Sequence, residues 1–570
     1  MQISKNTRHF LPENISISSF EDIKPYYEDL NTRTIDTKEA LEKWLLDRSE
    51  LDAVLEEDMA WRYIKLSIDN TNEALTQSYQ TFVGQIQPHI SPYEDLLNKK
   101  LLQSPALSQL QGEAYQIYIR SINTSVKLFR EENISIQAQI SEQSQEFGLI
   151  SGAQTITYDG KEITMQKAVS FLKETNRAVR EQVFQLMASR RLLDEEKLNE
   201  LYSSLFTKRH QIALNAGFEN FRDYMFEAMG RFDYTTQDCF DFHETIAAEI
   251  VPIVRQFQEE QQQKLGLESL RPWDTEVDPD GHRPLKPFET GSDLLQGTVE
   301  MLHQIDSYFG DCLETMDKMG HLDLESKAGK SPGGYNYPLY ETGVPFIFMN
   351  AVGSHRDLVT MVHEGGHAIH SFLSRELPIT GFKSLPSEVA ELASMSMELI
   401  SMDNWSRFYP EPTDLKRAKK EQLKSVLQIL PWIATIDEFQ HRLYENPNHS
   451  TEERTTIWLN LLQKYGTGLV DWSGFEKTQA TSWQRQLHLF EVPFYYIEYG
   501  IAQLGALGVW MNYKQNPAKA IQQYKDALSL GYTKSIPEIY ATAGVQFDFS
   551  KNNVKKLVEF IKAELETLNN

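Results

Sequence analysis

His363, Glu364 and His367 are the residues in this chain whose types and spacing are best suited to chemistry. Residues four apart on a helix share one face, so the two imidazoles can hold a single metal ion. This H-E-x-x-H pattern predicts zinc, which lowers the pKa of its bound water to about 7. Glu364, one step round the helix, is expected to accept the water proton as the water attacks a carbonyl group. Two surface histidines on an amphipathic helix are the alternative interpretation.

A zinc site of this kind needs a third protein ligand. The segment 386–398 begins with Pro-Ser, a helix start, and carries three carboxylates at helical spacing. These are Glu388, Glu391 and Glu398, which share one stripe of the expected helix. Spacing alone leaves all three open as ligands, and each is also acceptable as a solvated carboxylate.

The helix that carries the two histidines has a clear start. Ser354 is expected to cap a helix that begins at His355, and Asp357 in its first turn favours the helix dipole. Gly365 and Gly366 lie inside this helix, where each costs about 1 kcal/mol relative to alanine. Glycines at such positions indicate that something approaches the helix backbone closely.

The rest of the chain indicates a mainly α-helical fold. Residues 18–150 show apolar positions at helical spacing, and this periodicity returns after a hairpin signal at 155–165, where two β-prone runs flank Asp-Gly. The longest irregular region, 270–355, is expected to hold a few short strands. Helices then dominate to the C-terminus.

Composition excludes several classes of function. The 570 residues carry a net charge of −25, whereas a nucleic-acid-binding protein needs a basic face. No apolar stretch approaches the roughly 20 residues that span a bilayer, and no signal peptide is recognised. Two cysteines, Cys239 and Cys312, cannot form a cysteine zinc finger or a disulfide framework. A cytoplasmic protein without nucleic-acid or membrane partners is expected.

The motif at His363–His370, followed by the segment 386–398, resembles the thimet/oligoendopeptidase F group of metallopeptidases, peptidase family M3, and most closely its oligoendopeptidase F branch. The resemblance runs from about residue 15 to the C-terminus. It implies a two-lobed helical zincin-type fold with a deep central channel, a small β-ribbon beside the active-site helix and one zinc ion per chain. The expected lobes are an N-terminal helical lobe, 1–200, which includes the hairpin, and a catalytic domain, 201–570.

The resemblance also assigns ligand roles. In that family the third ligand is the glutamate of an E-x-x-S segment, which here is Glu391 with Ser394. Glu388 is then expected to orient a histidine ligand. His370 completes the family pattern H-E-x-G-H-x-x-H, and we interpret it as a histidine that packs the helix or supports a ligand.

A second matching segment, 483–500, resembles the family stretch in which a histidine and tyrosines reach over the zinc to bind substrate and oxyanion. His488 is the expected histidine. Tyr496 and Tyr499, three apart on a helix, are the expected hydroxyl donors. The thimet branch carries a further tyrosine that is missing here, so Tyr495 stays open as an alternative. Core packing is the other interpretation of these tyrosines.

The run 333–350 resembles the β-ribbon that precedes the active-site helix in that family. The edge of such a ribbon can pair with an extended peptide through main-chain hydrogen bonds. Gly353, just after the run, would allow close approach. An ordinary strand in a small sheet is the alternative.

Together these features predict a zinc-dependent endopeptidase that cuts internal bonds of short unfolded oligopeptides by Glu364-assisted attack of zinc-bound water. His488, with Tyr496 or Tyr499, is expected to stabilise the oxyanion. Two other functions stay open. One is a zinc metallocarboxypeptidase that trims chain ends, and the other is a non-catalytic peptide-binding relative, which would have no need of Glu364.

Overall fold

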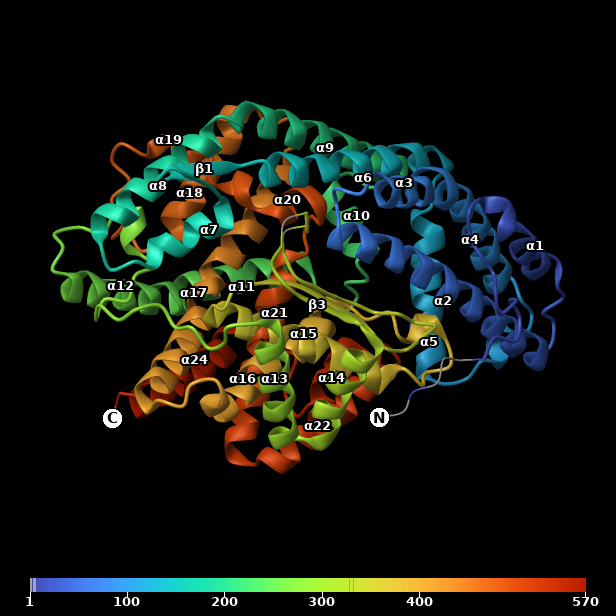
Figure 1. The fold of residues 1–570 in the computed structure, drawn as a ribbon. Coiled ribbons are helices and arrows are strands. Elements are labelled where there is room, and N and C mark those ends of the chain that lie inside the picture. Colours follow the sequence, from blue (N-terminus) through green and yellow to red (C-terminus); the bar gives the residue numbers. More distant parts are fainter. Residues whose placement is uncertain (1–2, 4–6, 328, 332, 570) are drawn as a thin grey trace.

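The structure is a computed structural model that describes residues 3, 7–327, 329–331 and 333–569, and it is mainly α-helical (Figure 1). The N-terminal helices are α1 (Lys24–Thr32), α2 (Lys38–Ile68), α3 (Glu73–Thr81), α4 (Gln87–Leu102), α5 (Glu113–Leu128), α6 (Glu131–Gly152), α7 (Met165–Ser170), α8 (Arg177–Leu192) and α9 (Glu195–Asn215). The middle of the chain forms α10 (Phe221–Ala228), α11 (Thr236–Glu249), α12 (Val251–Leu265), α13 (Gly291–Ile305) and α14 (Ser307–Met319). The remaining helices are α15 (His355–Ser374), α16 (Ser387–Ser401), α17 (Pro412–Glu445), α18 (Thr451–Tyr465), α19 (Glu476–Ala480), α20 (Leu487–Glu491), α21 (Tyr496–Gln515), α22 (Pro517–Ser529), α23 (Ile536–Thr542) and α24 (Lys551–Thr567).

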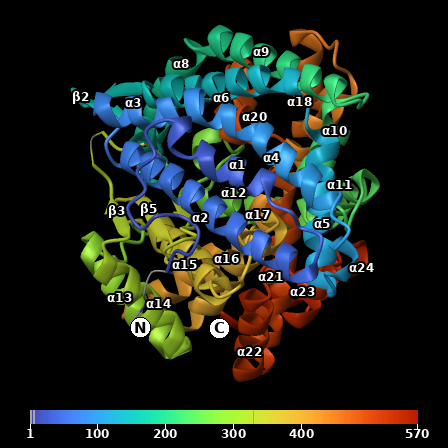
Figure 2. The same cartoon turned by 90° about the vertical axis from the view of Figure 1, so that its right-hand side faces the viewer.

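The predicted mainly helical, two-lobed fold is confirmed. Helices α1–α9 arch over a body that holds α13–α16 and α21–α24, with the β3–β5 sheet between them (Figure 1). The perpendicular view shows α1, α2, α4 and α5 as one layer in front of this body (Figure 2). The predicted boundary at residue 200 falls within the continuous helix α9, and the division into 1–200 and 201–570 stays a prediction. None of the described helices combines the length and apolar character that crossing a bilayer requires.

Two small sheets interrupt the helices. Strands β1 (Thr155–Tyr158) and β2 (Lys161–Thr164) form an antiparallel hairpin about the Asp-Gly turn. Strands β3 (Leu322–Glu325), β5 (Phe346–Ala351) and β4 (Tyr335–Tyr337) form the second sheet in that order, with β4 antiparallel to β5. The nearly continuous apolar run of β5 is buried, as expected for a central strand. Strand β4 lies at the edge of this sheet.

Helix α15 starts as predicted, because the Ser354 and Asp357 side chains form a capping box. It then packs against α16 at very close range. A Cβ atom at Gly366 would lie 2.7 Å from the Cα of Ser394, so only glycine fits there. At Gly365 the nearest atom would be 3.9 Å away, an ordinary contact. Of the two glycines in α15, only Gly366 shows the expected close approach, and it sets the spacing of α15 and α16.

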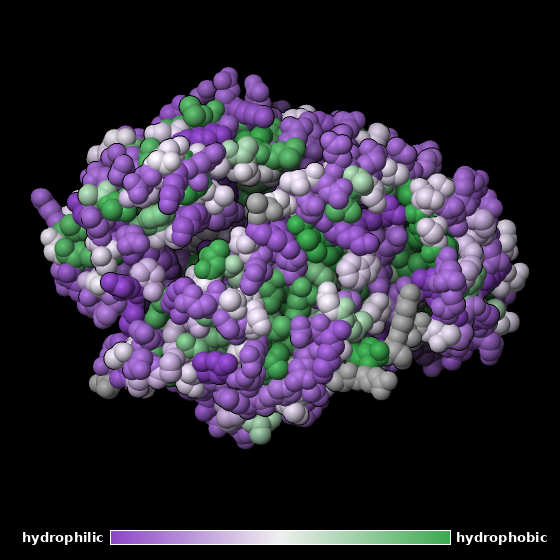
Figure 3. All heavy atoms as spheres, in the orientation of Figure 1, coloured by the Kyte–Doolittle hydropathy of each residue, from purple (hydrophilic) through white to green (hydrophobic). Residues whose placement is uncertain are grey.

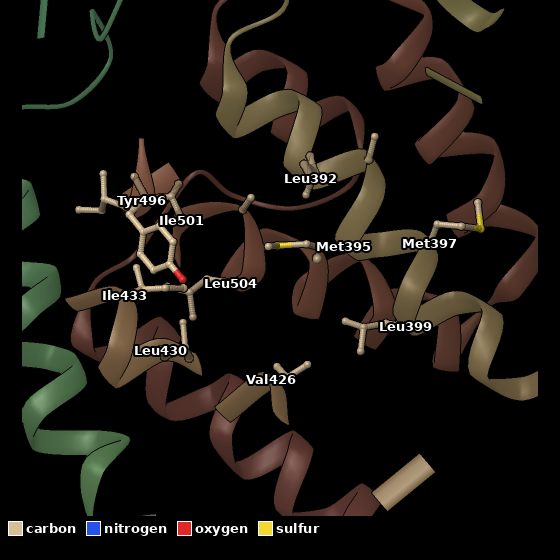
Figure 4. Packing of buried hydrophobic residues seen from close by; sticks show 14 of the residues in the cluster. Leu392, Met395, Met397, Leu399, Val426, Leu430, Ile433, Tyr496, Ile501 and Leu504 are labelled. Carbon is tan, nitrogen blue, oxygen red and sulfur yellow. The ribbon is translucent and has the colours of Figure 1, made fainter. Parts of the chain in front are cut away.

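Helix α16 is held on its other sides by α17 and α21. Its residues Leu392 and Met395 point into a buried cluster with Ile433 of α17 and Leu504 of α21 (Figure 4). Burying side chains of this size contributes roughly 1.5–3 kcal/mol each. The two helices that carry the predicted site are thus fixed by the main core of the protein.

Candidate active site

Helices α15 and α16 bring together the three predicted metal ligands. The Nε2 atom of His363 lies 3.3 Å from Oε2 of Glu391, and Nε2 of His367 lies 3.7 Å from the same oxygen. Their ligand atoms all lie within 4.8 Å of one another. Two imidazoles and one carboxylate that converge in this way fit the donor set of a zinc site with one position left for water or substrate.

The protonation of this set also suits a metal. Burial opposes ionisation of Glu391, but the neighbouring His367 and His363 outweigh it and lower the carboxyl pKa to about 2. Burial lowers the pKa of His367 to about 4 and keeps that ring neutral. Burial also acts against protonation of His363, yet Glu391 and Glu398 raise its pKa well above the usual value. A metal ion and a proton therefore compete for His363.

Glu398 orients His363, a role that the sequence analysis predicted for Glu388. The Nδ1 atom of His363 lies 2.6 Å from Oε1 of Glu398, and the amide of Gln422 donates to the other Glu398 oxygen at 2.8 Å. The predicted role of Glu388 is wrong. Its side chain accepts a hydrogen bond from the Tyr234 hydroxyl at 2.6 Å, and no described histidine contacts it. The signal for Glu398 was its place on the same stripe as Glu391.

Glu364 lies beside the ligand set and is almost fully buried, with 6% of its surface exposed. Burial raises the pKa of its carboxyl group to about 7. The amide of Asn336, on the edge strand β4, approaches the Glu364 backbone oxygen at 3.5 Å. A carboxyl group with such a pKa can accept and release a proton near neutral pH, and it does so next to the sheet edge.

His488 approaches from α20 and takes part in a chain of hydrogen bonds. The indole of Trp432 donates to Oε1 of Gln486 at 3.0 Å, so the other end of this amide is the NH₂ group. That NH₂ donates to Nδ1 of His488 at 2.7 Å. Burial lowers the pKa of His488 to about 4, so the ring is neutral and carries its proton on Nε2. This nitrogen is a hydrogen-bond donor, and it lies 3.4 Å from the Tyr499 hydroxyl.

The three tyrosines take different positions. The Tyr495 hydroxyl donates to Oε1 of Glu391 at 2.9 Å, so the alternative left open by the sequence is the one that touches a ligand. Burial raises the pKa of Tyr499 well above its usual value, with added effects of Glu391 and Glu364 nearby. The Tyr496 ring packs 4.8 Å from that of His488 and borders the buried cluster of Figure 4.

A cavity of about 280 Å³ continues from the ligands between the C-terminal end of α15, the N-terminal end of α16 and the segment after β4. The surface is also hollowed between the upper helices and the body on the face shown in Figure 3. His370 lines the cavity, is 1% exposed, and neither ring nitrogen has a hydrogen-bond partner among the described residues. Burial lowers its pKa to about 3, so it is a neutral ring that packs the helix.

Known proteins resemble this chain over most of its length. The model of peptidase family M3 matches residues 170–559, and that of the peptidase M3 N-terminal domain matches residues 10–129. An oligoendopeptidase F homolog of Borreliella burgdorferi is 25% identical over 70% of this chain and 66% of the relative. Oligopeptidase PepF of Bacillus subtilis is 22% identical over 84% of this chain and 71% of its own length. Group B oligopeptidase PepB of Streptococcus agalactiae is 20% identical over 90% of this chain and 89% of its own length.

Solved structures show the same likeness in three dimensions. PZ peptidase A, determined with an inhibitor, is 26% identical and superposes with a TM-score of 0.91 over 97% of this chain and 98% of that one. A structure assigned as an oligoendopeptidase F of Bacillus anthracis is 25% identical, with a TM-score of 0.88 over 97% of each chain. The likeness therefore includes both lobes and the helices that carry the candidate ligands.

Proposed function

The chain belongs to peptidase family M3, in its oligoendopeptidase F branch, and is a metalloendopeptidase; we propose that it uses one zinc ion to hydrolyse internal bonds of short unfolded oligopeptides. One observation carries this proposal. His363 and His367 of α15 converge with Glu391 of α16, and Glu364 lies at the next helix position. That arrangement combines a metal-binding set with a carboxyl group suited to proton transfer.

His363, His367 and Glu391 would hold the zinc ion. When bound, zinc supplies a Lewis acid that polarises a carbonyl group and makes water more acidic. Glu364 then accepts the proton of the attacking water and later passes it to the leaving amine. The burial that raises the pKa of Glu364 to about 7 supports both halves of this role.

His488 and Tyr499 are proposed to donate hydrogen bonds to the oxyanion that forms when the carbonyl is attacked. The support is the proton on Nε2 of His488, directed by Gln486, and the Tyr499 hydroxyl beside it. Tyr496 packs on His488 and is the second candidate donor. Removing one such donor typically costs about 2.7–4 kcal/mol in the activation barrier. Tyr495 is proposed instead to hold the ligand Glu391.

The substrate is proposed to lie extended along the edge strand β4. An edge strand offers unpaired main-chain groups to a peptide, and Asn336 of β4 lies against the backbone of Glu364. A site within a concavity of the protein favours short unfolded peptides, which can reach it, over folded proteins. The cytoplasm is the proposed location, since Cys239 and Cys312 are both free and buried, as is usual in a reducing compartment.

A peptide blocked at both ends tests the proposal. We expect the zinc-loaded enzyme to cut such a peptide internally, a metal chelator to abolish cleavage and added zinc to restore it. If the enzyme leaves the blocked peptide intact and removes single residues from the C-terminus of an unblocked peptide, it is a carboxypeptidase instead. Binding without any hydrolysis of a broad peptide mixture would establish a non-catalytic relative. Mass spectrometry of the products separates these outcomes.

A further inference from the structure

The cavity beside the metal ligands has an unusual charge pattern for so acidic a protein. Among the described residues that line it, Glu391 is the sole carboxylate, and it faces the histidines and Tyr495. At the other end of the cavity lie two cations, Arg375 and Lys383. The chain as a whole carries a net charge of −25. A cationic end in this cavity is therefore a local feature that general composition does not explain.

Lys383 has no counter-charge within hydrogen-bonding reach. Its ammonium forms no hydrogen bond or ion pair with any described residue, although the side chain is partly buried. Burial is the main cause that lowers its pKa; Glu376 opposes this effect and Arg375 adds to it. Among the described residues, Arg375 forms an ion pair with Glu376 alone, at 3.4 Å, and that carboxylate is 83% exposed and so well solvated. An ammonium held in a cavity without a partner is stabilised when a carboxylate enters.

The chain segments that carry the two cations are held by their surroundings. Arg375 follows the last turn of α15 and packs against Gly343, where a Cβ atom would come 3.1 Å from its Nε. Lys383 ends a short 3₁₀ turn, Thr380–Phe382, which is tied to the N-terminal lobe. The Thr380 backbone donates to the Ser49 hydroxyl at 2.6 Å. Anchored segments lose less freedom when a ligand binds, and this favours selection of that ligand.

The direction of the bound peptide decides which part of it reaches the cations. The cavity includes Asn336 and continues with Pro338, Leu339 and Tyr340, beyond the C-terminal end of β4. Antiparallel strand pairs outnumber parallel pairs about two- to three-fold. A peptide antiparallel to β4 sends residues on the N-terminal side of its cleaved bond into this end. Those residues carry a carboxylate only as an aspartate or glutamate side chain.

The geometry points to a substrate subsite in which Lys383 and Arg375 bind a carboxylate, supplied by an acidic side chain on the N-terminal side of the cleaved bond. This inference rests on the proposed peptidase function and makes it more specific. The enzyme prefers peptides that carry glutamate or aspartate at that place. The preference is local, and it runs against the repulsion that the acidic surface of the protein exerts on acidic peptides.

Matched peptides with both ends blocked test the subsite. One set carries glutamate, in turn, at each of the first three positions before the cleaved bond, and the other set carries glutamine. We expect kcat/KM for the best glutamate peptide to be about tenfold higher than for the matching glutamine peptide. A tenfold ratio corresponds to about one charge-assisted hydrogen bond. In Lys383→Gln and Arg375→Gln this ratio should fall toward one, because kcat/KM for the glutamate peptide falls more than kcat/KM for the glutamine peptide. Lys383→Arg should keep the preference, as should Lys519→Gln, which removes the charge of an exposed lysine on α22.

A third set compares a free C-terminus with an amidated one. If Lys383 acts on the free C-terminus and not on glutamate, the assigned direction is overturned. Equal hydrolysis of glutamate and glutamine peptides by the wild-type enzyme overturns the subsite and leaves the peptidase function intact. The subsite is also overturned if a wild-type preference persists in both charge-removing variants. Failure to cut any peptide overturns the peptidase function itself.

Discussion

Oε1 of Glu398 lies 2.6 Å from Nδ1 of His363, two helical turns beyond the ligand Glu391 on the same face of α16. This contact turns the other ring nitrogen of His363 toward Glu391. We therefore expect Glu398→Gln to weaken zinc binding by about 10–100-fold, as is usual when a residue that orients a ligand is lost. Competition with a chelator of known affinity measures the effect.

Glu388→Gln is the matched control for that variant. Glu388 lies on the same helix and is more deeply buried, with 1% of its surface exposed, but its partner is Tyr234. Its glutamine variant keeps an oxygen for this hydrogen bond and should bind zinc like the wild type. Equal zinc affinity in Glu398→Gln and wild type would contradict the role given to Glu398.

Gly366→Ala tests the spacing of α15 and α16. The added methyl group would meet the Ser394 backbone at 2.7 Å, so the helices must separate, and Glu391 moves away from the histidines. Overpacking of this kind costs about 1–3 kcal/mol in the free energy of unfolding, and we expect zinc affinity to fall with it. Gly365→Ala adds the same methyl group where the nearest atom is 3.9 Å away. It should retain zinc, and if both variants lose zinc equally, helix spacing is not the cause.

Gln486→Leu tests which ring nitrogen of His488 carries the proton. The hydrogen bond from Gln486 requires an acceptor at Nδ1, which leaves the proton on Nε2 facing Tyr499. We expect kcat to fall by roughly tenfold to a hundredfold, less than when a donor is removed outright. Nitrogen NMR of the ring should show the Nε2-protonated tautomer in the wild type and a mixture in the variant. A wild-type ring protonated on Nδ1 would disprove the assignment.

Glu438 on α17 makes the free energy of unfolding depend on pH in the acidic range. Burial acts to raise its pKa, but hydrogen bonds from Lys464, Tyr465 and Arg442 outweigh burial and lower the pKa to about 2. A carboxyl group whose pKa is lowered on folding stabilises the folded state at pH values above 4.5, the ordinary pKa of glutamate. That stabilisation is lost as the pH falls toward 2. At neutral pH the free energy of unfolding of the wild type should exceed that of Glu438→Gln by on the order of 2 kcal/mol. Denaturant unfolding should show this difference shrinking below pH 4.5, whereas a constant difference would contradict the assignment.

Local chemistry made much of this architecture predictable from the sequence. The Ser354 cap, the spacing of His363 and His367 and the Pro-Ser start of α16 each act within a few residues. The choice between Glu388 and Glu398 could not be made in that way. It depends on how α16 is rotated and spaced against α15, which the contact at Gly366 sets between distant parts of the chain.

The tyrosines show the same limit. Phe494 adopts a left-handed backbone conformation, with φ of 67°, directly before Tyr495. That turn, unusual for a phenylalanine, helps direct the Tyr495 hydroxyl to Glu391. Nothing in the spacing of three tyrosines predicts such a turn, which comes just before the helix that begins at Tyr496.

Glu364→Gln tests the central claim most directly. Glutamine keeps the shape of the side chain and leaves His363, His367 and Glu391 in place, but it cannot accept a proton. We expect the variant to bind one zinc per chain, as the wild type should, while kcat for a blocked peptide falls by several orders of magnitude. Elemental analysis and single-turnover hydrolysis measure the two quantities on the same sample. Wild-type turnover by the zinc-loaded variant would contradict the account.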